Sequence, residues 1–494
     1  MPGRYTKAGL ITSERSILDA LLDSNQALCT DVPMIDPRTE APNPIGEQIL
    51  GLYRSPTARK AVIADIETLA AFEAKRIAIP SFVEAGPRAG LSYNPHRVRA
   101  AIVTTGGLAP GLNCVIHSIV KRHCNTYSLD FQGKVFGVYN SFKGLVNLAH
   151  NLVELTPHET EDWLDQGGSK LGSVRYYHDD TPDEQTKETM VRLISASLRN
   201  NQIDILYVIG GDGSLDMAHR IADANPSLSI AGIPKTMDND ILWVWQSFGF
   251  NTAVEQATRV INTLRGEAES TRRICIVELF GAESGFVAAN AALASGHVDL
   301  VLIPEVFRLL NAEQAQDYLH AALNYLERKV QSEPHDPHAV VVVAEGVGKA
   351  LGEIGAVLSG AQVTKDNFTG LLKKAMRDHV KDAYGEAMEV FENQPRHYIR
   401  AVPANSHDQI YCERLGALAV DNALAGYTNF MVSQWLTEFV LVPLRLMTGQ
   451  KGIPVNGMFW KQVVSSTGQP LSPGEYPVAR RADKPPRDGE AGAG

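Results

Sequence analysis

Residues 205–222 read ILYVIGGDGSLDMAHRIA, and this stretch joins an apolar strand to a helix through a glycine-rich turn. The strand is apolar almost throughout, as parallel strands covered on both faces are. Gly210 and Gly211 end it, and the helix expected after the turn covers residues 217–225. In sheets of this kind, ligands bind at the carboxyl ends of the strands. The stretch therefore predicts a strand–helix unit with a ligand-binding turn.

Similar units recur along the chain. A second expected helix covers residues 252–264, and the β-branched runs that alternate with such helices predict an α/β architecture. The other expected strands are RAAIVTT (99–105), KVFGVYN (134–140), SIAGIPK (229–235), RICIVEL (273–279), LVLIPE (300–305) and AVVVVAEG (339–346).

The two ends of the chain differ from this pattern. Residues 1–95 are predicted to form an N-terminal extension, with helical pieces at 16–24 and 55–76 and a proline-rich, loop-like stretch at 31–46. Residues 473–494 are polar and rich in proline, glycine and charge, which predicts a disordered tail.

Composition excludes several classes of protein. The chain has 494 residues and a formal net charge of −10, from 46 basic and 56 acidic residues, which argues against a nucleic-acid-binding protein. Its five cysteines form no CxxC pair, so we expect neither a disulfide framework nor structural zinc. There is no apolar leader, and the apolar stretch at 439–447 is too short and too interrupted to cross a bilayer. We expect a cytoplasmic protein that does not associate with membranes.

Two strand ends carry glycine-rich turns. In TTGGLAPGLN (104–113), Gly106 and Gly107 follow a strand, and glycines there let backbone N–H groups approach an anion. An ordinary tight turn would look the same. In the turn at 210–214, Asp212 can hold Mg²⁺ beside a bound polyphosphate, or it can simply cap the helix.

A third strand end, GIPKTMDNDI (232–241), is crowded with polar groups. Asp238 and Asp240 stand two residues apart, which is unfavourable unless a cation or a proton donor is near. One carboxylate can act as general base toward a hydroxyl and the other can place a metal. Lys235 can neutralise a transferring phosphate. The alternative is a solvated surface turn.

The fourth feature is GGSKLGSVR (167–175), where Arg175 can clamp a phosphate or can be an ordinary surface arginine. Taken together, the four stretches predict phosphoryl transfer with a metal ion. No Walker A sequence, protein-kinase motif or Ser-His-Asp signature competes with this interpretation.

The same motifs, in the same order, resemble the phosphofructokinase family. PE at 304–305, AEG at 344–346 and HYIR at 397–400 complete the set, and the similarity covers roughly residues 86–470. It is greatest to the long, plant-like branch. The resemblance implies two Rossmann-like lobes with an N-terminal extension. It places the phosphoryl donor on residues 96–249 and 401–450, and the acceptor on residues 250–400.

The resemblance also implies roles for individual residues. Asp238 is the implied general base for the sugar 1-hydroxyl, with Thr236 and Lys235 as its catalytic neighbours. The residues implied to bind the donor are Gly106, Gly107, Arg175, Gly211, Asp212, Gly213 and Ser214, and those implied to bind Mg²⁺ are Asp212 and Asp240. The residues implied to line the acceptor pocket are Thr236, Asp238, Asp240, Arg273, Phe280, Gly281, Ala282, Glu283, Glu345, His397 and Arg400.

Two further properties follow from the resemblance. Arg273 lies where a neighbouring subunit's arginine reaches the sugar phosphate in short bacterial members, which implies a homo-oligomer, a dimer or a tetramer. Gly213 resembles the small residue that leaves room for a nucleotide, whereas Lys235 is typical of pyrophosphate users. Plant-like ATP enzymes combine the two, so ATP is the expected donor and pyrophosphate the alternative.

The stretch ICIVELFGAESGF (274–286) departs from the family pattern. The family reads Met-Gly-Arg where this chain has Phe280, Gly281 and Ala282, and Glu283 follows. A second phosphate-binding arginine of the short bacterial members falls on Phe391. A buried arginine–phosphate contact contributes about 2–3 kcal/mol, so another cation must replace it or the acceptor must differ. The candidate replacements are Lys373, Lys374 and Arg396.

The expected function is therefore Mg²⁺-dependent phosphoryl transfer from ATP to a sugar-phosphate hydroxyl, of the 6-phosphofructokinase type. Three alternatives remain open: a kinase of the same fold with another acceptor, such as a sugar, a nucleoside or a small metabolite alcohol; a pyrophosphate-dependent phosphofructokinase; and a non-catalytic regulatory subunit.

Overall fold

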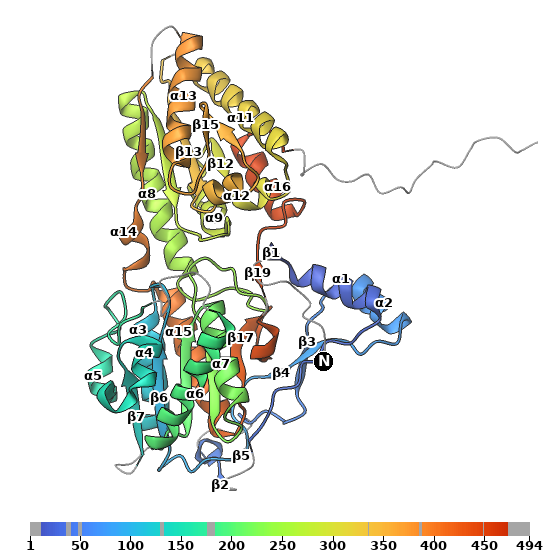
Figure 1. Cartoon of the computed structure of the whole chain (residues 1–494), viewed down its shortest axis with the longest axis vertical. Coiled ribbons are helices and arrows are strands. Elements are labelled where there is room, and N and C mark those ends of the chain that lie inside the picture. Colours follow the sequence, from blue (N-terminus) through green and yellow to red (C-terminus); the bar gives the residue numbers. More distant parts are fainter. Residues whose placement is uncertain are drawn as a thin grey trace, which may run out of the picture. The chain divides into compact units, whose positions relative to one another are not determined.

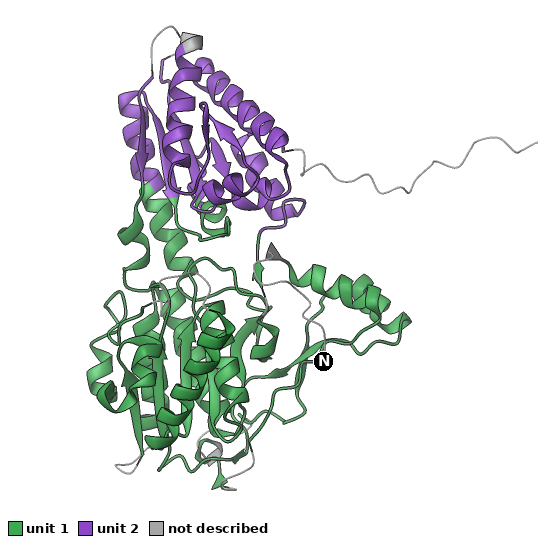
Figure 2. Cartoon of the chain, viewed as in Figure 1, with its two compact units in different colours: residues 1–260, 279–291, 394–452 green, residues 261–278, 292–393, 453–494 purple. Residues whose placement is uncertain are grey.

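The computed structural model describes residues 11–35, 41–47, 52–128, 133–174, 183–333, 335–384, 388–447 and 449–472. The chain divides into two compact units (Figure 2). Unit 1 comprises Met1–Val260, Leu279–Ala291 and Gln394–Gly452, and unit 2 comprises Ile261–Glu278, Ala292–Asn393 and Ile453–Gly494.

Unit 1 is built on a nine-stranded sheet in the order β3-β4-β18-β17-β10-β9-β6-β7-β8. Its strands are β3 (Arg59–Ala61), β4 (Ser81–Glu84), β6 (Arg99–Thr104), β7 (Lys134–Val138), β8 (Leu152–Glu154), β9 (Ile205–Gly210), β10 (Ser229–Pro234), β17 (Phe430–Trp435) and β18 (Glu438–Pro443). The five central strands, from β17 to β7, are parallel, and the outer strands pair antiparallel. Because β9 and β10 are buried at every residue, they read as continuous apolar runs.

Helices cover this sheet (Figure 1). Strand β10 is packed against both α7 (Asp212–Asp223) and α15 (Ser406–Leu424). The other helical elements of unit 1 are α3 (Leu112–Lys121), the π-helix η2 (Arg122–Thr126), α4 (Ser141–Val146), η3 (Leu148–His150), α5 (Pro157–Glu161), α6 (Glu184–Asn200), α14 (Arg396–Arg400) and η4 (Leu444–Leu446). The described helices include none that is long and apolar enough to span a bilayer.

The N-terminal extension is part of the fold of unit 1. Strands β3 and β4 extend the main sheet through β18, and β1 (Ile11–Thr12) pairs in parallel with β19 (Gln450–Lys451). Its other elements are α1 (Glu14–Ser24), β2 (Ala41–Pro42), η1 (Pro44–Glu47), α2 (Ile66–Ala74) and β5 (Gly90–Leu91). The proline-rich stretch thus contains a short strand and a 3₁₀ turn where a loop was predicted.

Unit 2 has a four-stranded sheet in the order β12-β13-β11-β16. The strands are β11 (Ile274–Leu279), β12 (Leu300–Leu302), β13 (Ala339–Ala344) and β16 (Val390–Asn393), and β14 (Val357–Leu358) and β15 (Ala361–Gln362) form a separate hairpin. Helices assigned wholly or partly to this unit are α8 (Phe250–Thr271), α9 (Phe286–Ser295), α10 (Pro304–Phe307), α11 (Ala312–Ser332), α12 (Val347–Glu353), α13 (Phe368–Tyr384) and α16 (Met458–Thr467).

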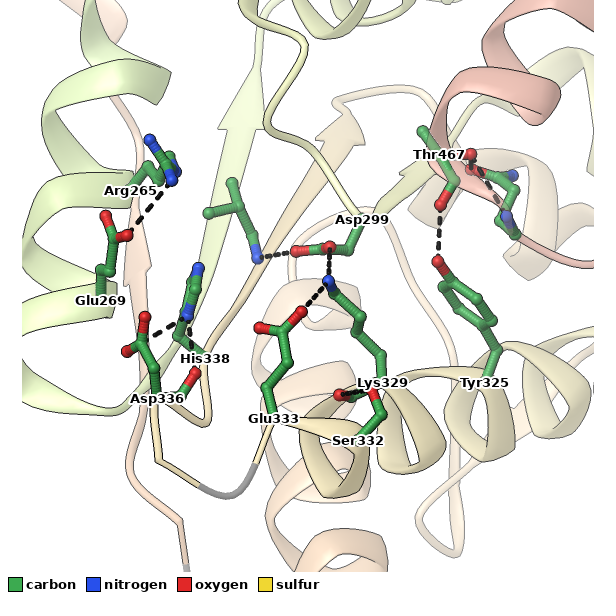
Figure 3. Close-up of polar contacts among 12 residues, drawn as sticks. Arg265, Glu269, Asp299, Tyr325, Lys329, Ser332, Glu333, Asp336, His338 and Thr467 are labelled. Atoms are coloured by element: carbon green, nitrogen blue, oxygen red, sulfur yellow. Dashed lines mark hydrogen bonds and ion pairs between the residues drawn. The ribbon is translucent and has the colours of Figure 1, made fainter.

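Polar contacts attach the C-terminal segment to unit 2 (Figure 3). The Tyr325 hydroxyl of α11 donates to the Thr467 carbonyl at 2.5 Å. The side chain of Gln469 pairs with the backbone of Val301 in β12 through two hydrogen bonds, of 2.8 and 3.0 Å. Nearby, Lys329 lies 3.7 Å from the carboxylate of Asp299. These contacts explain why residues 453–472, beyond both predicted lobes, belong to unit 2.

The seven predicted strands are confirmed as β6, β7, β9, β10, β11, β12 and β13, and the α/β fold class is confirmed with them. The helix expected at 217–225 begins earlier, at Asp212, because Gly211 is its N-cap. The segments of the predicted acceptor lobe that belong to unit 1 are 250–260, 279–291 and 394–400. The assignment of donor and acceptor to the two lobes stays a prediction. The tail predicted to be disordered lies outside the described residues.

We predict that His123 makes unit 1 sensitive to acid. Its ring is fully buried, one ring nitrogen lies 2.8 Å from the Tyr207 hydroxyl, and burial lowers its pKa to about 3. The unfolded chain binds that proton near pH 6.5, so stability present above about pH 6.5 is lost as the pH falls toward 3, by up to about 1.4 kcal/mol per pH unit. His123→Gln keeps a polar partner for Tyr207 without titrating, so its stability should fall less.

Urea unfolding at about pH 5 and pH 7.5 measures the difference. His96→Gln, at an exposed histidine, is the matched control and should follow the wild type. Equal losses in His123→Gln and the wild type would contradict the prediction.

Candidate active site

The turn between β6 and α3 requires glycine at two positions. Gly106 and Gly111 have φ values of 87° and 99°, in the left-handed region. A Cβ at Gly111 would lie 2.7 Å from the Cys412 sulfur. The ammonium of Lys235, at the end of β10, donates to the carbonyl of Gly107. Among the described residues, a Cβ on Gly107 would meet no atom within 4 Å, so the backbone there faces open space.

The turn between β9 and α7 forms a second open backbone surface. Gly211 is the N-cap of α7 and Asp212 is the first helical residue, so the alternative in which Asp212 caps the helix is wrong. A Cβ on Gly210 would lie 2.4 Å from the Cβ of Ser214, whereas one on Gly213 would meet nothing within 4 Å. The backbone N–H groups in the first turn of this 12-residue helix lie at the positive end of its dipole, which favours an anion.

The loop after β10 is packed by its own hydrogen bonds. The Thr236 hydroxyl donates to the Asp240 carboxylate at 3.0 Å and accepts from the backbone N–H of Asp238 at 3.1 Å. Lys235 and Asp240 are only 4% and 7% exposed, which excludes a solvated surface turn. Asp238 is partly exposed. This arrangement leaves Asp238 accessible to a ligand while its neighbours are held in place.

The turn at 280–285 lies directly against this loop. Ala282 has a φ of 46°, and the Ser284 N–H closes the turn by donating to the Gly281 carbonyl at 2.7 Å. The Ser284 hydroxyl then donates to the backbone carbonyl of Asp238 at 2.8 Å. The turn that departs from the family pattern therefore supports the predicted general base.

A cation approaches the same turn from α14. The guanidinium carbon of Arg400 lies 4.9 Å from the centre of the Phe280 ring, within the range of a cation–π contact. Its Nε atom is buried and has no hydrogen-bond partner among the described residues. His397 and Arg396, on the same short helix, are exposed. Arg400 is thus held beside the altered turn with donor capacity unused.

The other predicted residues are distributed as follows. In unit 2, Glu345 lies 3.5 Å from the ammonium of Lys365, and Arg273 pairs with Glu389 at 2.8 Å. Lys373 and Lys374, on α13, also belong to unit 2. Arg175 lies outside the described residues. The residues that unit 1 brings together are Gly106, Gly107, Gly211, Asp212, Gly213, Ser214, Lys235, Thr236, Asp238, Asp240, Phe280, Gly281, Ala282, Glu283, His397 and Arg400.

Comparison with known proteins adds independent information on the family. The sequence profile of the family described as Phosphofructokinase matches residues 99–423, more than half of the chain. The chain belongs to the phosphofructokinase family.

Named relatives of this phosphofructokinase cover most of its length. A Borreliella burgdorferi protein named ATP-dependent 6-phosphofructokinase is 36% identical over 79% of this chain and 85% of its own. A protein of the same name from Amycolatopsis methanolica is 36% identical over 84% of this chain and 88% of its own. ATP-dependent 6-phosphofructokinase 7 of Arabidopsis thaliana is 34% identical over 79% of this chain and 77% of its own.

Solved structures confirm the fold. A pyrophosphate-dependent phosphofructokinase from Marinobacter aquaeolei aligns with a TM-score of 0.58 at 19% identity, over 76% of this chain and 94% of its own. Pichia pastoris phosphofructokinase aligns with a TM-score of 0.57 at 22% identity, over 71% of this chain and 35% of its own, longer chain.

The donor atoms of this phosphofructokinase fit a magnesium ion. Burial, and secondly the charge of Asp212, raise the pKa of Asp240 to about 6, so a cation between the two carboxylates is favourable. Mg²⁺ prefers oxygen ligands and takes one or two carboxylates, with water and phosphate completing its shell. Among the described residues, one group of at least three His, Cys, Asp or Glu side chains has its ligand atoms within 4.8 Å of one another. It consists of Glu269, Asp336 and His338, which are not predicted site residues.

Two residues of the site were not predicted. The Gln450 amide donates to the Asp212 carboxylate at 3.2 Å, and the Ser284 hydroxyl contacts the Asp238 loop. Gln450 is 238 positions from Asp212, so no local pattern signals the contact.

We predict that Asp240→Asn stabilises the metal-free protein. The folded pKa of Asp240, about 6, lies above its unfolded value of about 3.9. Its ionisation therefore costs stability progressively from about pH 4 to 6 and fully above pH 6. At about pH 7.5 without Mg²⁺, the variant should melt a few degrees higher, and this gain should shrink toward pH 4.

Thermal unfolding in the presence of EDTA measures the effect. Asp216→Asn is the matched control, because Asp216 lies on α7 in an ion pair with Arg220 at 3.0 Å and should gain nothing. A melting temperature for Asp240→Asn at or below that of the wild type would show that the ionised, buried Asp240 does not destabilise the fold.

Proposed function

We propose that this chain is an ATP-dependent 6-phosphofructokinase, which uses Mg²⁺ and transfers the γ-phosphoryl group of ATP to the 1-hydroxyl of fructose 6-phosphate. The observation that carries the proposal is the buried Lys235–Asp240 loop beside two open glycine turns, at the ends of adjacent parallel strands. Relatives of that name, 36% identical over most of the chain, support it.

The donor would be held by the two glycine turns. Backbone N–H groups around Gly107 and at the start of α7 would bind the phosphate oxygens, because the space beside Gly107 and Gly213 is open among the described residues. Lys235, which contacts the Gly107 carbonyl, turns to the phosphates and neutralises part of their charge. Asp212 and Asp240 would hold Mg²⁺, which when bound supplies further positive charge to the transferring group.

The transfer itself would use Asp238 as general base. Its carboxylate accepts the proton of the sugar 1-hydroxyl as that oxygen bonds to the γ-phosphorus. The bond from the γ-phosphorus to the bridging oxygen breaks, and ADP leaves with the bonding electrons. Thr236 and Ser284 keep the loop in place through hydrogen bonds to Asp240 and to the Asp238 backbone.

ATP is favoured over pyrophosphate by the space beside Gly213, where a Cβ would meet no atom within 4 Å. The relatives named ATP-dependent favour it as well. Two of the solved structures with this fold are pyrophosphate-dependent enzymes. The family resemblance makes Lys235 typical of such enzymes. Pyrophosphate therefore remains the second candidate donor.

The acceptor phosphate would be bound by Arg400. Its guanidinium is stacked on Phe280, beside the position where Ala282 replaces the family's arginine, and its Nε is unpaired among the described residues. A cation in this place supports fructose 6-phosphate over a less anionic acceptor, and Glu345 and His397 would contact the sugar. A homo-oligomer in which Arg273 completes a neighbour's pocket, and a cytoplasmic location, are further parts of the proposal; two relatives are named chloroplastic.

The first test replaces the general base. Asp238→Asn should lower kcat with fructose 6-phosphate by at least about 10²-fold and leave ATP affinity nearly unchanged, because the amide cannot accept the proton. Coupled assays with ATP and with pyrophosphate at fixed Mg²⁺ identify the donor. The same assays after chelation of the metal show whether Mg²⁺ is needed. Wild-type protein without turnover on either donor would contradict the proposal.

The second test concerns the acceptor phosphate. Arg400→Ala should raise the KM for fructose 6-phosphate by about a hundredfold, as expected for the loss of about 2–3 kcal/mol of charge-assisted binding. Arg396→Ala, on the same helix but exposed, is the matched control and should change KM little. A larger effect at Arg396 would reassign the phosphate contact to that residue.

A further inference from the structure

A two-residue strand connects the N-terminal segment with the catalytic loop. In β19, Gln450 and Lys451 pair in parallel with Ile11 and Thr12 of β1. On the other side, Gln450 forms an antiparallel bridge with Ile241, the residue after Asp240. Strand β19 therefore lies between the start of the described chain and the loop that carries the predicted base.

The side chain of Gln450 contacts a predicted metal ligand. Its amide nitrogen donates to Oδ2 of Asp212 at 3.2 Å. A hydrogen bond to one oxygen fixes the rotation of a carboxylate and so orients the other oxygen. Such partners of ligating carboxylates commonly contribute about 10- to 100-fold to metal affinity or activity.

Lys451 holds the backbone of the second predicted metal ligand, Asp240, from the same strand. Its backbone N–H donates to the carbonyl of Asp240 at 2.8 Å. Its side chain is only 8% exposed, and its ammonium donates to the carbonyls of Val244 and, at 3.3 Å, Trp245. One short strand thus touches both Asp212 and the loop that ends in Asp240.

The N-terminal segment also holds this loop at a second point. Glu14, the first residue of α1, accepts the backbone N–H of Trp243 at 3.0 Å. Trp243 has a φ of 62°, and its buried ring packs against Phe82 and Trp435, with ring centres 5.7 and 5.9 Å apart. A non-glycine residue in this conformation must be held by its surroundings, and Glu14 supplies one of the contacts that hold it.

We propose that Gln450 is a positioning residue for the magnesium-binding carboxylate of Asp212, and that pairing with β1 of the N-terminal segment keeps Gln450 in place. The inference rests on the proposed function, because it takes Asp212 as the ligand of the nucleotide's metal. It assigns the N-terminal segment a part in metal binding, which it would exert through Gln450.

The test compares ATP affinity with and without Mg²⁺, by calorimetric titration of the purified full-length protein. Gln450→Met has nearly the same length and lacks the N–H donor, so the gain in ATP affinity on adding Mg²⁺ should fall about tenfold. ATP affinity without Mg²⁺ should stay unchanged, which controls for folding. The matched control is Gln434→Met, because the Gln434 amide donates to the backbone carbonyl of Leu436, at 3.3 Å, rather than to a carboxylate.

A second variant tests the role of the N-terminal segment. Deletion of residues 1–12 removes β1 and leaves Gln450 in the chain. The increase in ATP affinity on adding Mg²⁺ should be about as small as in Gln450→Met. The ATP affinity without Mg²⁺ should stay the same. A full Mg²⁺ gain in this deletion would overturn the part of the proposal that concerns the N-terminal segment.

The outcomes separate this inference from the proposed function. A full Mg²⁺ gain in Gln450→Met would overturn the inference, even if the wild type phosphorylates fructose 6-phosphate. Wild-type protein that binds Mg²⁺–ATP through Gln450 but does not turn over fructose 6-phosphate would support the inference and contradict the proposed acceptor. If Mg²⁺ does not increase the ATP affinity of the wild type, the inference is overturned, because Asp212 then holds no metal for the nucleotide.

Discussion

The buried carboxylate of Asp240, with the charge of Asp212 nearby, is the constraint on which the rest of the site depends. Both carboxylates follow adjacent parallel strands, β9 and β10, and burial together with the nearby Asp212 charge raises the pKa of Asp240 to about 6. A folded chain tolerates this only with compensating contacts, which Thr236, Gln450 and Lys451 provide. A magnesium ion would turn the same unfavourable pair into a binding site, so stability is exchanged here for affinity toward a cation.

On the predicted acceptor side, we propose that a cation comes from an element other than the turn at 280–285. Ala282 stands where the family's arginine is expected, yet the turn keeps its structural task, because the Ser284 hydroxyl still supports the backbone of Asp238. Arg400 approaches over Phe280, an aromatic face that suits a guanidinium. The apolar bulk that first argued against an anionic acceptor therefore provides the surface on which a cation is placed.

The N-terminal extension belongs to unit 1, which carries the predicted base and metal ligands. Strands β3 and β4 extend the main sheet. Strand β1 pairs with β19, and Glu14 accepts a hydrogen bond from Trp243 in the loop between Asp240 and Trp245. The contacts involved are a backbone pairing and a hydrogen bond to a main-chain N–H, and neither depends on a recognisable motif. For this reason the sequence predicted residues 1–95 as an extension separate from the α/β fold.

The sequence by itself determined the parts of this protein that are encoded locally. Apolar runs such as 205–210 and 339–344 predicted the buried strands, and the glycine turns and the PKTMDND loop predicted the chemistry, because strand, turn and helix are consecutive in the chain. Only the tertiary structure decided the contacts between distant segments: Gln450 with Asp212, Glu14 with Trp243, and Arg400 with Phe280. Such pairs depend on how the strands are ordered in the sheet, and the spacing of residues along the chain carries no record of that order.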